Sequence, residues 1–466
     1  MEKKQMKDMT SGSPMKLILS FLIPMLFGLL FQQLYNMVDT IIVGKYLGVN
    51  ALAAVGSTGS INFMIIGFCT GVCSGFSIPV AQKFGEKNEV GLRRFVANGA
   101  WLSIAFAVVM TTVVCLLCRK ILQWMNTPAD IIDGAYAYIF VIFLGIPATY
   151  LYNTLSGIIR SLGDSTTPLL FLLISSLLNV ALDLFTIIGL GMGVEGAAWA
   201  TIISQAVSGV LCLIYMTKKF PILRMTGDEW KPDRNAMITL CNMGIPMGLQ
   251  YSITAIGSVV LQTAVNSLGS VAVASVTAGS KISTFFCCPF DAMGATMATY
   301  GGQNVGAKKL SRIKKGMKCC VFLGAVYSII GFLALYFFSD VVALMFVDGG
   351  ETEILANTRS FLLVNSAFYI PLALVNIVRF MIQGLGFSKL AIIAGVCEMA
   401  ARTLVGFIFV PIFGYSAVCF ANPVAWLAAD LFLIPAYYKV MKQLMHLFVQ
   451  RPRETKTKAG AKAIAL

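Results

Sequence analysis

Long apolar stretches separated by short polar segments recur along the whole chain. About twelve of them reach the length of roughly 20 residues that a helix needs to cross a bilayer. They lie near 17–43, 52–80, 95–118, 131–158, 166–190, 195–216, 236–263, 271–300, 318–338, 355–383, 388–413 and 416–438. The pattern predicts an all-α integral membrane protein with twelve transmembrane helices and no soluble catalytic domain.

The apolar pattern repeats once, with an offset of about 222 residues. Pro24 matches Pro246, and residues 160–163 match residues 383–386. Six spans in each copy place the two copies parallel, related by an axis along the membrane normal. We therefore predict two six-helix lobes related by pseudo-two-fold symmetry.

The repeat and the polar breaks predict the limits of each part. The expected parts are an N-terminus at 1–16, an N-lobe at 17–216, a linker at 217–235, a C-lobe at 236–438 and a C-terminal tail at 439–466. Pro221, Gly227 and Pro232 give the linker the composition of a loop. No small-residue cleavage site follows the first apolar run, so we expect it to be retained as a helix.

Basic residues are unevenly distributed between alternate loops. The chain has 35 Lys and Arg against 21 Asp and Glu, and 28 of the 35 fall in the termini and in every second loop. This asymmetry predicts that both termini and the basic loops are cytoplasmic, in a protein of the cell membrane. The net charge of +14 is thereby accounted for as a topology signal, and no nucleic-acid partner is expected.

Glycine and proline mark close contacts and bends. Gly67, Gly71 and Gly75 form a doubled GxxxG in the second predicted helix, which favours close packing against another helix. Pro24 and Pro246 lie at matching places in the first helix of each copy, where a proline permits either a bend or an irregularity of packing.

Polar residues form a stripe in the first predicted helix. Gln32, Tyr35, Asn36 and Asp39 are spaced i, i+3, i+4 and i+7, so they share one face. Lipid cannot satisfy these groups, so the face is expected to point inward. Inserting a carboxylate at this depth costs a few kcal/mol, which favours a functional role for Asp39.

The fifth and sixth predicted helices carry similar stripes, with Asn179 and Asp183 on one and Thr201 and Gln205 on the other. Two carboxylates close together in a medium of low dielectric cannot both remain ionised at low cost, so the acids can accept a proton. Their oxygens, with those of Asn179 and Thr201, could instead hold Na⁺. The residues are compatible with either H⁺ or Na⁺ as the coupling ion. A relay of histidines is excluded, because the only histidine, His446, lies in the C-terminal tail.

The second copy contains ionisable groups of a different kind. They are Lys281, Asp291, Arg379, Glu398, Arg402 and Asp430. Glu398 and Arg402 stand at i and i+4, where they can neutralise each other. These residues could form structural ion pairs, or they could line a substrate cavity, and the sequence leaves both interpretations possible.

Two apparent motifs carry no chemistry. Gly191, Gly193 and Gly196 spell GxGxxG, but an apolar helix precedes them where a dinucleotide site needs a strand. Cys115 and Cys118 spell CxxC, but they lie in an apolar span and no histidine is present beside them to activate a thiol. We expect neither an enzyme nor a bound cofactor.

Five stretches together resemble a known family. They are FQQLYNMVDTIIVGKYLG (31–48), IIRSLGDSTTP (158–168), LNVALDLFTI (178–187), GVEGAAWAT (193–201) and PFDAMGATMATYGGQNVGA (289–307). The chain resembles the MATE (multidrug and toxic compound extrusion) transporters over most of its length. Thr254 stands where the NorM-like branch has an acid, so the chain is most similar to the DinF-like and MepA-like bacterial branch.

The resemblance implies a secondary active antiporter that exports lipophilic organic cations in exchange for H⁺ or Na⁺. It implies a cation-coupling network at Gln32, Asp39, Asn153, Asn179, Asp183 and Thr201. Candidate residues of the substrate cavity are Tyr35, Asn36, Gln205, Gln250, Asp291, Glu398 and Arg402. The expected partners are the organic cations and membrane lipid, and the chain is expected to act as a monomer.

Three other functions compete with this hypothesis. A flippase for lipid-linked cell-envelope precursors belongs to the same superfamily, but it would need a strongly cationic cavity. An ion channel would show rings of residues built by oligomeric symmetry. A membrane enzyme would need a nucleophile and a base that the chain does not offer.

Overall fold

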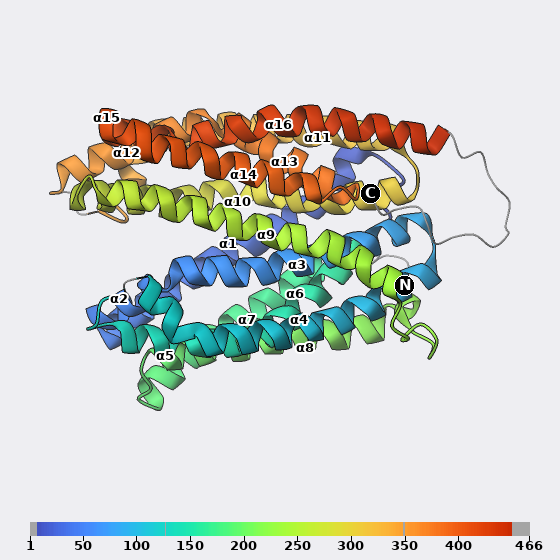
Figure 1. Cartoon of the computed structure of the whole chain (residues 1–466), viewed down its shortest axis with the longest axis horizontal. Coiled ribbons are helices and arrows are strands. Elements are labelled where there is room, and N and C mark those ends of the chain that lie inside the picture. Colours follow the sequence, from blue (N-terminus) through green and yellow to red (C-terminus); the bar gives the residue numbers. More distant parts are fainter. Residues whose placement is uncertain (1–6, 126, 348–349, 450–466) are drawn as a thin grey trace. The chain divides into compact units, whose positions relative to one another are not determined.

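The computed structural model describes residues 7–125, 127–347 and 350–449, which form sixteen α-helices and no strand (Figure 1). The helices of the first repeat are α1 (Pro14–Leu47), α2 (Val49–Ser57), α3 (Gly59–Glu86), α4 (Glu89–Trp124), α5 (Ile132–Leu144), α6 (Ile146–Ser161), α7 (Thr166–Leu184) and α8 (Val194–Lys219). Those of the second are α9 (Arg234–Asn266), α10 (Ser270–Gly306), α11 (Leu310–Ala343), α12 (Thr352–Ala367), α13 (Tyr369–Gly384), α14 (Lys389–Leu404), α15 (Val410–Phe413) and α16 (Tyr415–Val449).

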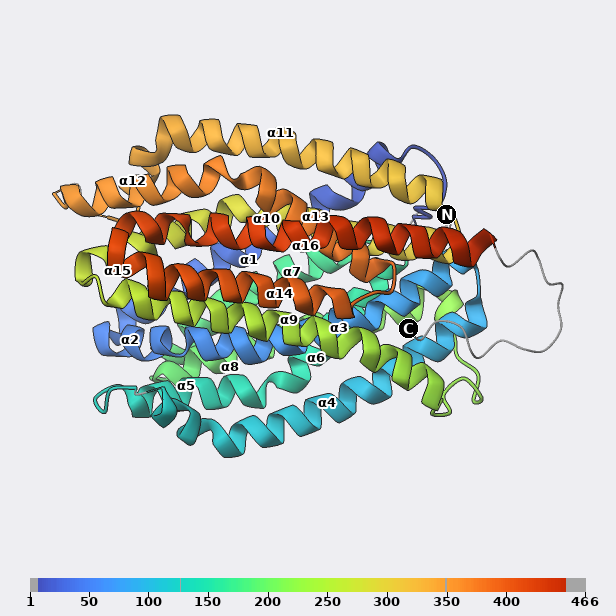
Figure 2. The ribbon, with the colours of Figure 1, turned by 45° about the horizontal axis from the view of Figure 1, so that its top comes forward.

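Among the described residues, ten helices are long and apolar enough to cross a membrane as single spans. Two further spans are broken: α5 and α6 meet at 44°, and α12 and α13 meet at 53°. Counting each bent pair once gives twelve spans, which confirms the predicted all-α fold. Figure 2 shows α12 and α13 following one another at the bend.

The start of the second predicted span needs correction. The apolar run at 52–80 contains two helices, because α2 ends at Ser57 and α3 begins at Gly59. Gly48 precedes α2 with φ of 87°, and Gly269 precedes α10 with φ of 95°. Glycine adopts these positive values at little cost, so the same local break recurs in both repeats.

The helices form two compact units, which divide the chain differently from the predicted lobes. Unit 1 contains residues 7–8 and 27–248, and unit 2 contains residues 9–26 and 249–449. The divisions fall inside α1 and α9, two residues after Pro24 and Pro246. The predicted lobes follow the sequence repeat, whereas the units follow packing, and the predicted lobe limits remain an expectation.

Glycines allow close helix packing in unit 1, as the GxxxG pattern predicts. A Cβ on Gly71 would lie 2.7 Å from the carbonyl oxygen of Met247, and one on Gly75 would lie 2.4 Å from Cα of Gly244. Neither gap admits a side chain.

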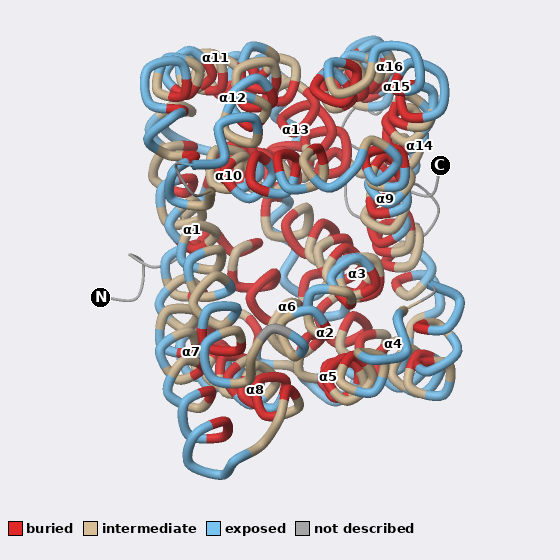
Figure 3. Tube along the Cα trace, turned by 90° about the vertical axis from the view of Figure 1, so that its left-hand side faces the viewer, coloured by how far each residue is buried: buried red, intermediate tan, exposed pale blue. Residues whose placement is uncertain are grey.

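Unit 2 has its core along α10 and α13, where Figure 3 shows many buried residues. A Cβ on Gly384 of α13 would lie 2.4 Å from the carbonyl oxygen of Ala298 on α10. The start of the described chain also packs in this unit, because the buried Met9 donates its amide hydrogen to Gln303 Oε1 at 2.9 Å. Arg312 donates to the Met9 carbonyl at 3.1 Å.

Candidate functional site

Asp39 on α1 and Asp183 in the last turn of α7 bring their carboxyl groups together in unit 1. Asp183 is fully buried, and Asp39 is half-buried. Among the described residues, no ordinary donor reaches either oxygen of Asp183 or Oδ1 of Asp39. A hydrogen bond between the two groups needs a proton on one of them, so the site is unsatisfied unless it binds a cation.

Asn179 extends this site one turn back along α7. Its Nδ2 donates to Thr201 Oγ1 on α8 at 3.5 Å, while its buried Oδ1 has no donor among the described residues. The Thr201 hydroxyl donates to the carbonyl of Ala197 at 3.0 Å. Carboxylate and amide oxygens of three side chains are therefore free to bind a proton or a hard cation.

A π-helical turn (Phe185–Gly189) follows Asp183 directly. π-Turns inside α-helices occur frequently at functional sites, because they displace one residue from the regular ladder. The second repeat has the same feature at Val405–Phe409, after Leu404 ends α14. Neither π-helical turn could be predicted, because both sequences are as apolar as the α-helices before them.

Two tyrosines lie beside the carboxylates. Tyr35 on α1 interacts with Asp39 and Asp183 and forms a side-chain hydrogen bond with Gln32. Tyr138 on α5 is buried close to the same two acids. Tyr138 was not predicted, because it is one aromatic residue in an apolar run and has no polar neighbour at helical spacing.

The remaining polar residues predicted in the first repeat lie elsewhere. Asn153 donates to the carbonyl of Thr149 in its own helix at 2.9 Å, and no hydrogen bond among the described residues joins it to the acids. The Thr149 hydroxyl donates to Gln205 Oε1 at 3.0 Å, which links α6 to α8. The Asn36 side chain is exposed. The roles of Asn153, Gln205 and Asn36 in ion or substrate binding remain predictions.

A cluster of charged residues lies inside unit 2. Glu398 on α14 forms a short ion pair with Arg379 on α13 and a second with Arg402 at 3.5 Å. All three side chains are less than 10% exposed. Arg402 Nε also donates to Asn422 Oδ1 at 3.3 Å. The i and i+4 pair forms as predicted, but the bridge to Arg379 was missed because that residue lies on another helix.

Two other predicted cavity residues of unit 2 have contrasting environments. Gln250 on α9 is buried and accepts a hydrogen bond from Gln383 Nε2 at 2.6 Å. Asp291 on α10 is exposed although it lies inside a predicted span. An exposed carboxylate at this depth has to face water rather than lipid. Asp430 on α16 is buried and lies near Arg379.

Twelve apolar spans in two repeats, with a pair of neighbouring carboxylates in unit 1 whose buried oxygens have no donor among the described residues, are typical of a multi-pass membrane transporter. The MatE family model matches residues 24–185 and again residues 246–408. The chain belongs to the MatE family.

Relatives by sequence and by structure agree with this assignment. The chain is 27% identical to "Probable multidrug resistance protein YoeA" of Bacillus subtilis (strain 168), over 72% of this chain and 74% of that protein. It is 23% identical to "Multidrug export protein MepA" of Staphylococcus saprophyticus, over 59% and 61%. The fold matches a structure described as "Outward-facing conformation of a multidrug resistance MATE family transporter of the MOP superfamily", with a TM-score of 0.89, 23% identity, and coverage of 95% of this chain and 98% of the other. These relatives are transporters rather than enzymes.

Proposed function

We propose that this protein is a secondary active multidrug efflux antiporter that exports lipophilic organic cations in exchange for H⁺ or Na⁺ by alternating access. The observation that carries the proposal is the set of buried oxygens on Asp39, Asp183 and Asn179 that meet no donor among the described residues. A cation that binds here stabilises the protein, because it interacts with buried oxygens that otherwise have no partner. The names of the two relatives support export of several compounds.

Exchange requires that the coupling ion and the exported cation do not bind stably at the same time. This requirement is a negative coupling free energy between two ligands. Binding of H⁺ or Na⁺ at Asp39 and Asp183 neutralises the charge that attracts an organic cation, so the affinity for the exported compound falls. A bend of α1 near Pro24 would link this change to the conformation of unit 1.

The two candidate ions would use the site differently. One proton lets Asp39 and Asp183 share an O–H···O hydrogen bond, which satisfies two of the free oxygens. Na⁺ would instead take oxygen ligands from both acids and from Asn179. We assign the exposed Asp291 and the predicted cavity residues Tyr35, Asn36, Gln205, Gln250, Glu398 and Arg402 to the path of the exported compound.

We also propose that the chain acts as a monomer with both termini and the basic loops in the cytoplasm. The uneven distribution of Lys and Arg supports this orientation. A flippase of lipid-linked precursors is less well supported, because Glu398 and Asp430 offset the charge of Arg379 and Arg402. A pyrophosphate group would need cations without such partners.

The test is ethidium efflux from proteoliposomes, driven in turn by a pH gradient and by a Na⁺ gradient. We expect efflux to follow one gradient in the wild type and to disappear in Asp39→Asn and in Asp183→Asn. Asp133→Asn is the matched control, because Asp133 is an exposed carboxylate that pairs with Arg119 at 3.1 Å. Wild-type efflux in both site variants would refute the coupling site and favour the flippase.

A further inference from the structure

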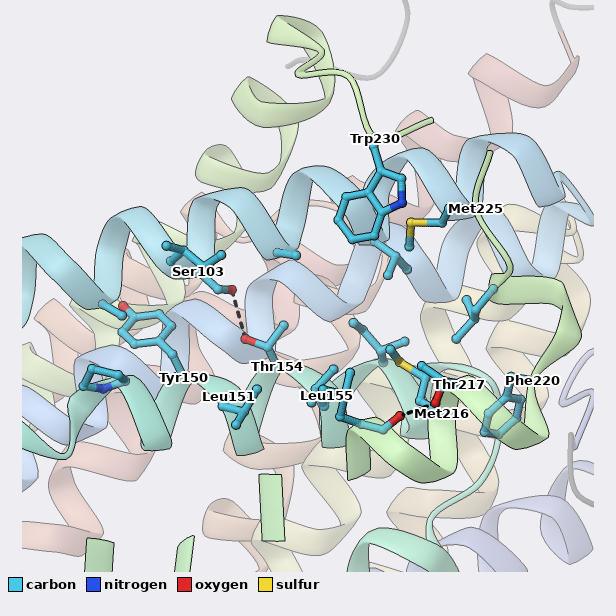
Figure 4. Close-up of a pocket in the computed structure, with 18 of the residues that line it drawn as sticks. Ser103, Tyr150, Leu151, Thr154, Leu155, Met216, Thr217, Phe220, Met225 and Trp230 are labelled. Atoms are coloured by element: carbon cyan, nitrogen blue, oxygen red, sulfur yellow. Dashed lines mark hydrogen bonds between the residues drawn. The ribbon is translucent and has the colours of Figure 1, made fainter. Parts of the chain in front are cut away.

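A cavity lies in unit 1, and its lining residues include none of the carboxylate site (Figure 4). Its volume is about 530 Å³, within the range of about 300–1,000 Å³ that is usual for small-molecule sites. The walls come from α4, α6 and α8, and one end is closed by the linker after α8. Most of the lining is aliphatic or aromatic.

The bend between α5 and α6 makes room for this cavity. α5 packs against both α4 and α8, and Gly145 then turns the chain by 44° into α6. Pro147, in the first turn of α6, lines the cavity. Since α6 departs from the line of α5, a gap between α4 and α8 remains beside it.

The cavity borders the lipid-facing surface of unit 1. Ile104 and Val108 on α4 are 58% and 59% exposed, and Leu213 on α8 is 40% exposed. All three line the cavity. Exposed aliphatic side chains on membrane-spanning helices contact acyl chains, so the rim of the cavity lies where lipid is present.

The serine and threonine hydroxyls in the lining pair with each other or with the backbone, and the Tyr150 hydroxyl, which has no hydrogen-bond partner among the described residues, is itself buried. The hydroxyls of Ser103 and Thr154 bond to each other at 3.0 Å, as the dashed line in Figure 4 shows. The Thr217 hydroxyl donates to the carbonyl of Leu213 at 3.0 Å. The hydroxyls of Ser103, Thr154 and Thr217 therefore offer no free donor to a polar drug, and the walls suit a flexible apolar chain.

The linker end of the cavity has a different composition. Arg224 is the one charged residue of the lining, and it is exposed. Its guanidinium forms no ion pair in the part of the chain that the structure describes. Trp230 lies at the same end, and Trp101 Nε1 donates to its carbonyl at 3.0 Å. Tryptophan and basic residues are typical of the membrane–water interface, where lipid phosphates lie.

We propose that this cavity binds one acyl chain of an anionic phospholipid, whose phosphate group pairs with Arg224. The lipid comes from the leaflet on the linker side of the membrane. The apolar walls select the chain, and the single unpaired guanidinium at the mouth selects the negative headgroup. This site is independent of ion coupling, because it includes neither Asp39 nor Asp183.

The experiment uses the full chain in liposomes that contain phosphatidylglycerol with a photoactivatable group in one acyl chain. After illumination, labelled peptides are identified by mass spectrometry. We expect labels on α4 near Ile104 and on α8 near Met216. Unlabelled phosphatidylglycerol should compete for these positions better than phosphatidylcholine with the same chains.

Two pairs of variants separate the contributions of the headgroup and the acyl chain. Arg224→Ala should lower labelling roughly fivefold, since one basic residue near the membrane surface contributes about that factor. Lys315→Ala, which removes an exposed charge in unit 2, should not. Ala100→Phe fills the cavity and should abolish labelling, whereas Leu116→Phe, at a 78% exposed position of α4, should not.

Thermal unfolding in detergent shows whether each variant is folded. If Ala100→Phe does not fold, two measurements still test the proposal: the labelling of Arg224→Ala relative to the wild type, and the competition by the two unlabelled lipids. Equal labelling in Arg224→Ala and the wild type, or equal competition by both lipids, would overturn the headgroup assignment. Displacement of the label by ethidium but not by phosphatidylglycerol would show a drug site instead. None of these readouts depends on efflux, so the site can fail while the antiporter proposal stands.

Discussion

Asn179 in the first repeat and Arg402 in the second occupy matching positions, and each donates a hydrogen bond to the spanning helix that follows. Asn179 Nδ2 lies 3.5 Å from Thr201 Oγ1, and Arg402 Nε lies 3.3 Å from Asn422 Oδ1. The contact is retained between the repeats, although one donor is neutral and the other is charged. The two repeats therefore share the position of this hydrogen bond but differ in the charge of the donor.

The positions of the two acids differ more strongly. Asp39 and Asp183 correspond to Val260 and Gly406 in the second repeat. A Cβ on Gly406 would lie 3.3 Å from Cβ of Ala264 and 4.0 Å from the Val260 carbonyl oxygen, so apolar packing fills this place. Unit 1 holds two neighbouring acids whose buried oxygens have no donor among the described residues. Unit 2 instead pairs Glu398 with Arg379 and Arg402, and within the same part of the chain it leaves Oδ1 of Asp430 without a donor. We infer that the neighbouring acids of unit 1 serve ion binding, and that the ion pairs of Glu398 stabilise unit 2 in addition to the place proposed for Glu398 and Arg402 on the path of the exported compound.

Glu398→Gln should give the largest loss of stability. The substitution removes the ion-pair partner of Arg379 and Arg402, which leaves the buried Arg402 without a carboxylate partner among the described residues and Arg379 with only two nearby aspartates, and it costs about 3–5 kcal/mol. The measurement is thermal unfolding in detergent. Glu353→Gln, an exposed glutamate of α12, is the control. Equal unfolding of the two variants would mean that the cluster does not stabilise unit 2 and would favour a role in binding substrate.

Arg402→Asn installs the residue of the first repeat and should cost less, about 1.5–3 kcal/mol for a hydrogen bond to a charged group. The cost is smaller because Arg379 remains paired with Glu398. A double-mutant cycle with Glu398→Gln measures the coupling. Additive losses would show that Arg402 and Glu398 act independently, contrary to the ion pair at 3.5 Å.

Asp183→Asn should stabilise the protein, whereas the two preceding substitutions should destabilise it. An amide can donate a hydrogen bond to Asp39, and the substitution removes a buried charge that has no donor, so we expect a gain of about 1 kcal/mol. Efflux coupling should nevertheless be lost. Asp133→Asn, at an exposed position, controls for charge. If Asp183→Asn instead destabilised the protein, the carboxylate of Asp183 would stabilise the fold, and the proposed difference in role between the two repeats would be wrong.

The contrast between the repeats was only partly predictable from the sequence. Helical spacing predicted the polar face that holds Asp39 and the i and i+4 pair of Glu398 and Arg402, because these patterns are local. Tyr138 and Arg379 reach their clusters through tertiary packing, which spacing within one helix does not encode. The bends of 44° and 53° were also missed, because a broken span has the same apolar composition as a straight one.

Glu229 provides the smallest expected effect, from a carboxylate outside the spans. It accepts a hydrogen bond from the Thr226 amide at 2.8 Å and pairs with Arg93 at 2.8 Å. The amide of Thr226 and then Arg93 lower the pKa of Glu229 from its ordinary value of 4.5. Its stabilisation is therefore present above that value and is lost as the pH falls through the lowered pKa.

At pH 7, Glu229→Gln should cost about 0.2–1 kcal/mol. The arginine and glutamate side chains of this pair are only 16% and 8% exposed, but the pair lies at the linker, outside the predicted spans, and the glutamine can still accept a hydrogen bond from the Thr226 amide. The difference in unfolding temperature from the wild type should disappear at acidic pH, once Glu229 is protonated in both states. Glu86→Gln, in the exposed pair with Lys83 at 2.5 Å, is the control. A loss as large as that of Glu398→Gln would show that burial in the membrane does not set the strength of these pairs. The assignment of stability to unit 2 and ion binding to unit 1 would then lose its physical basis.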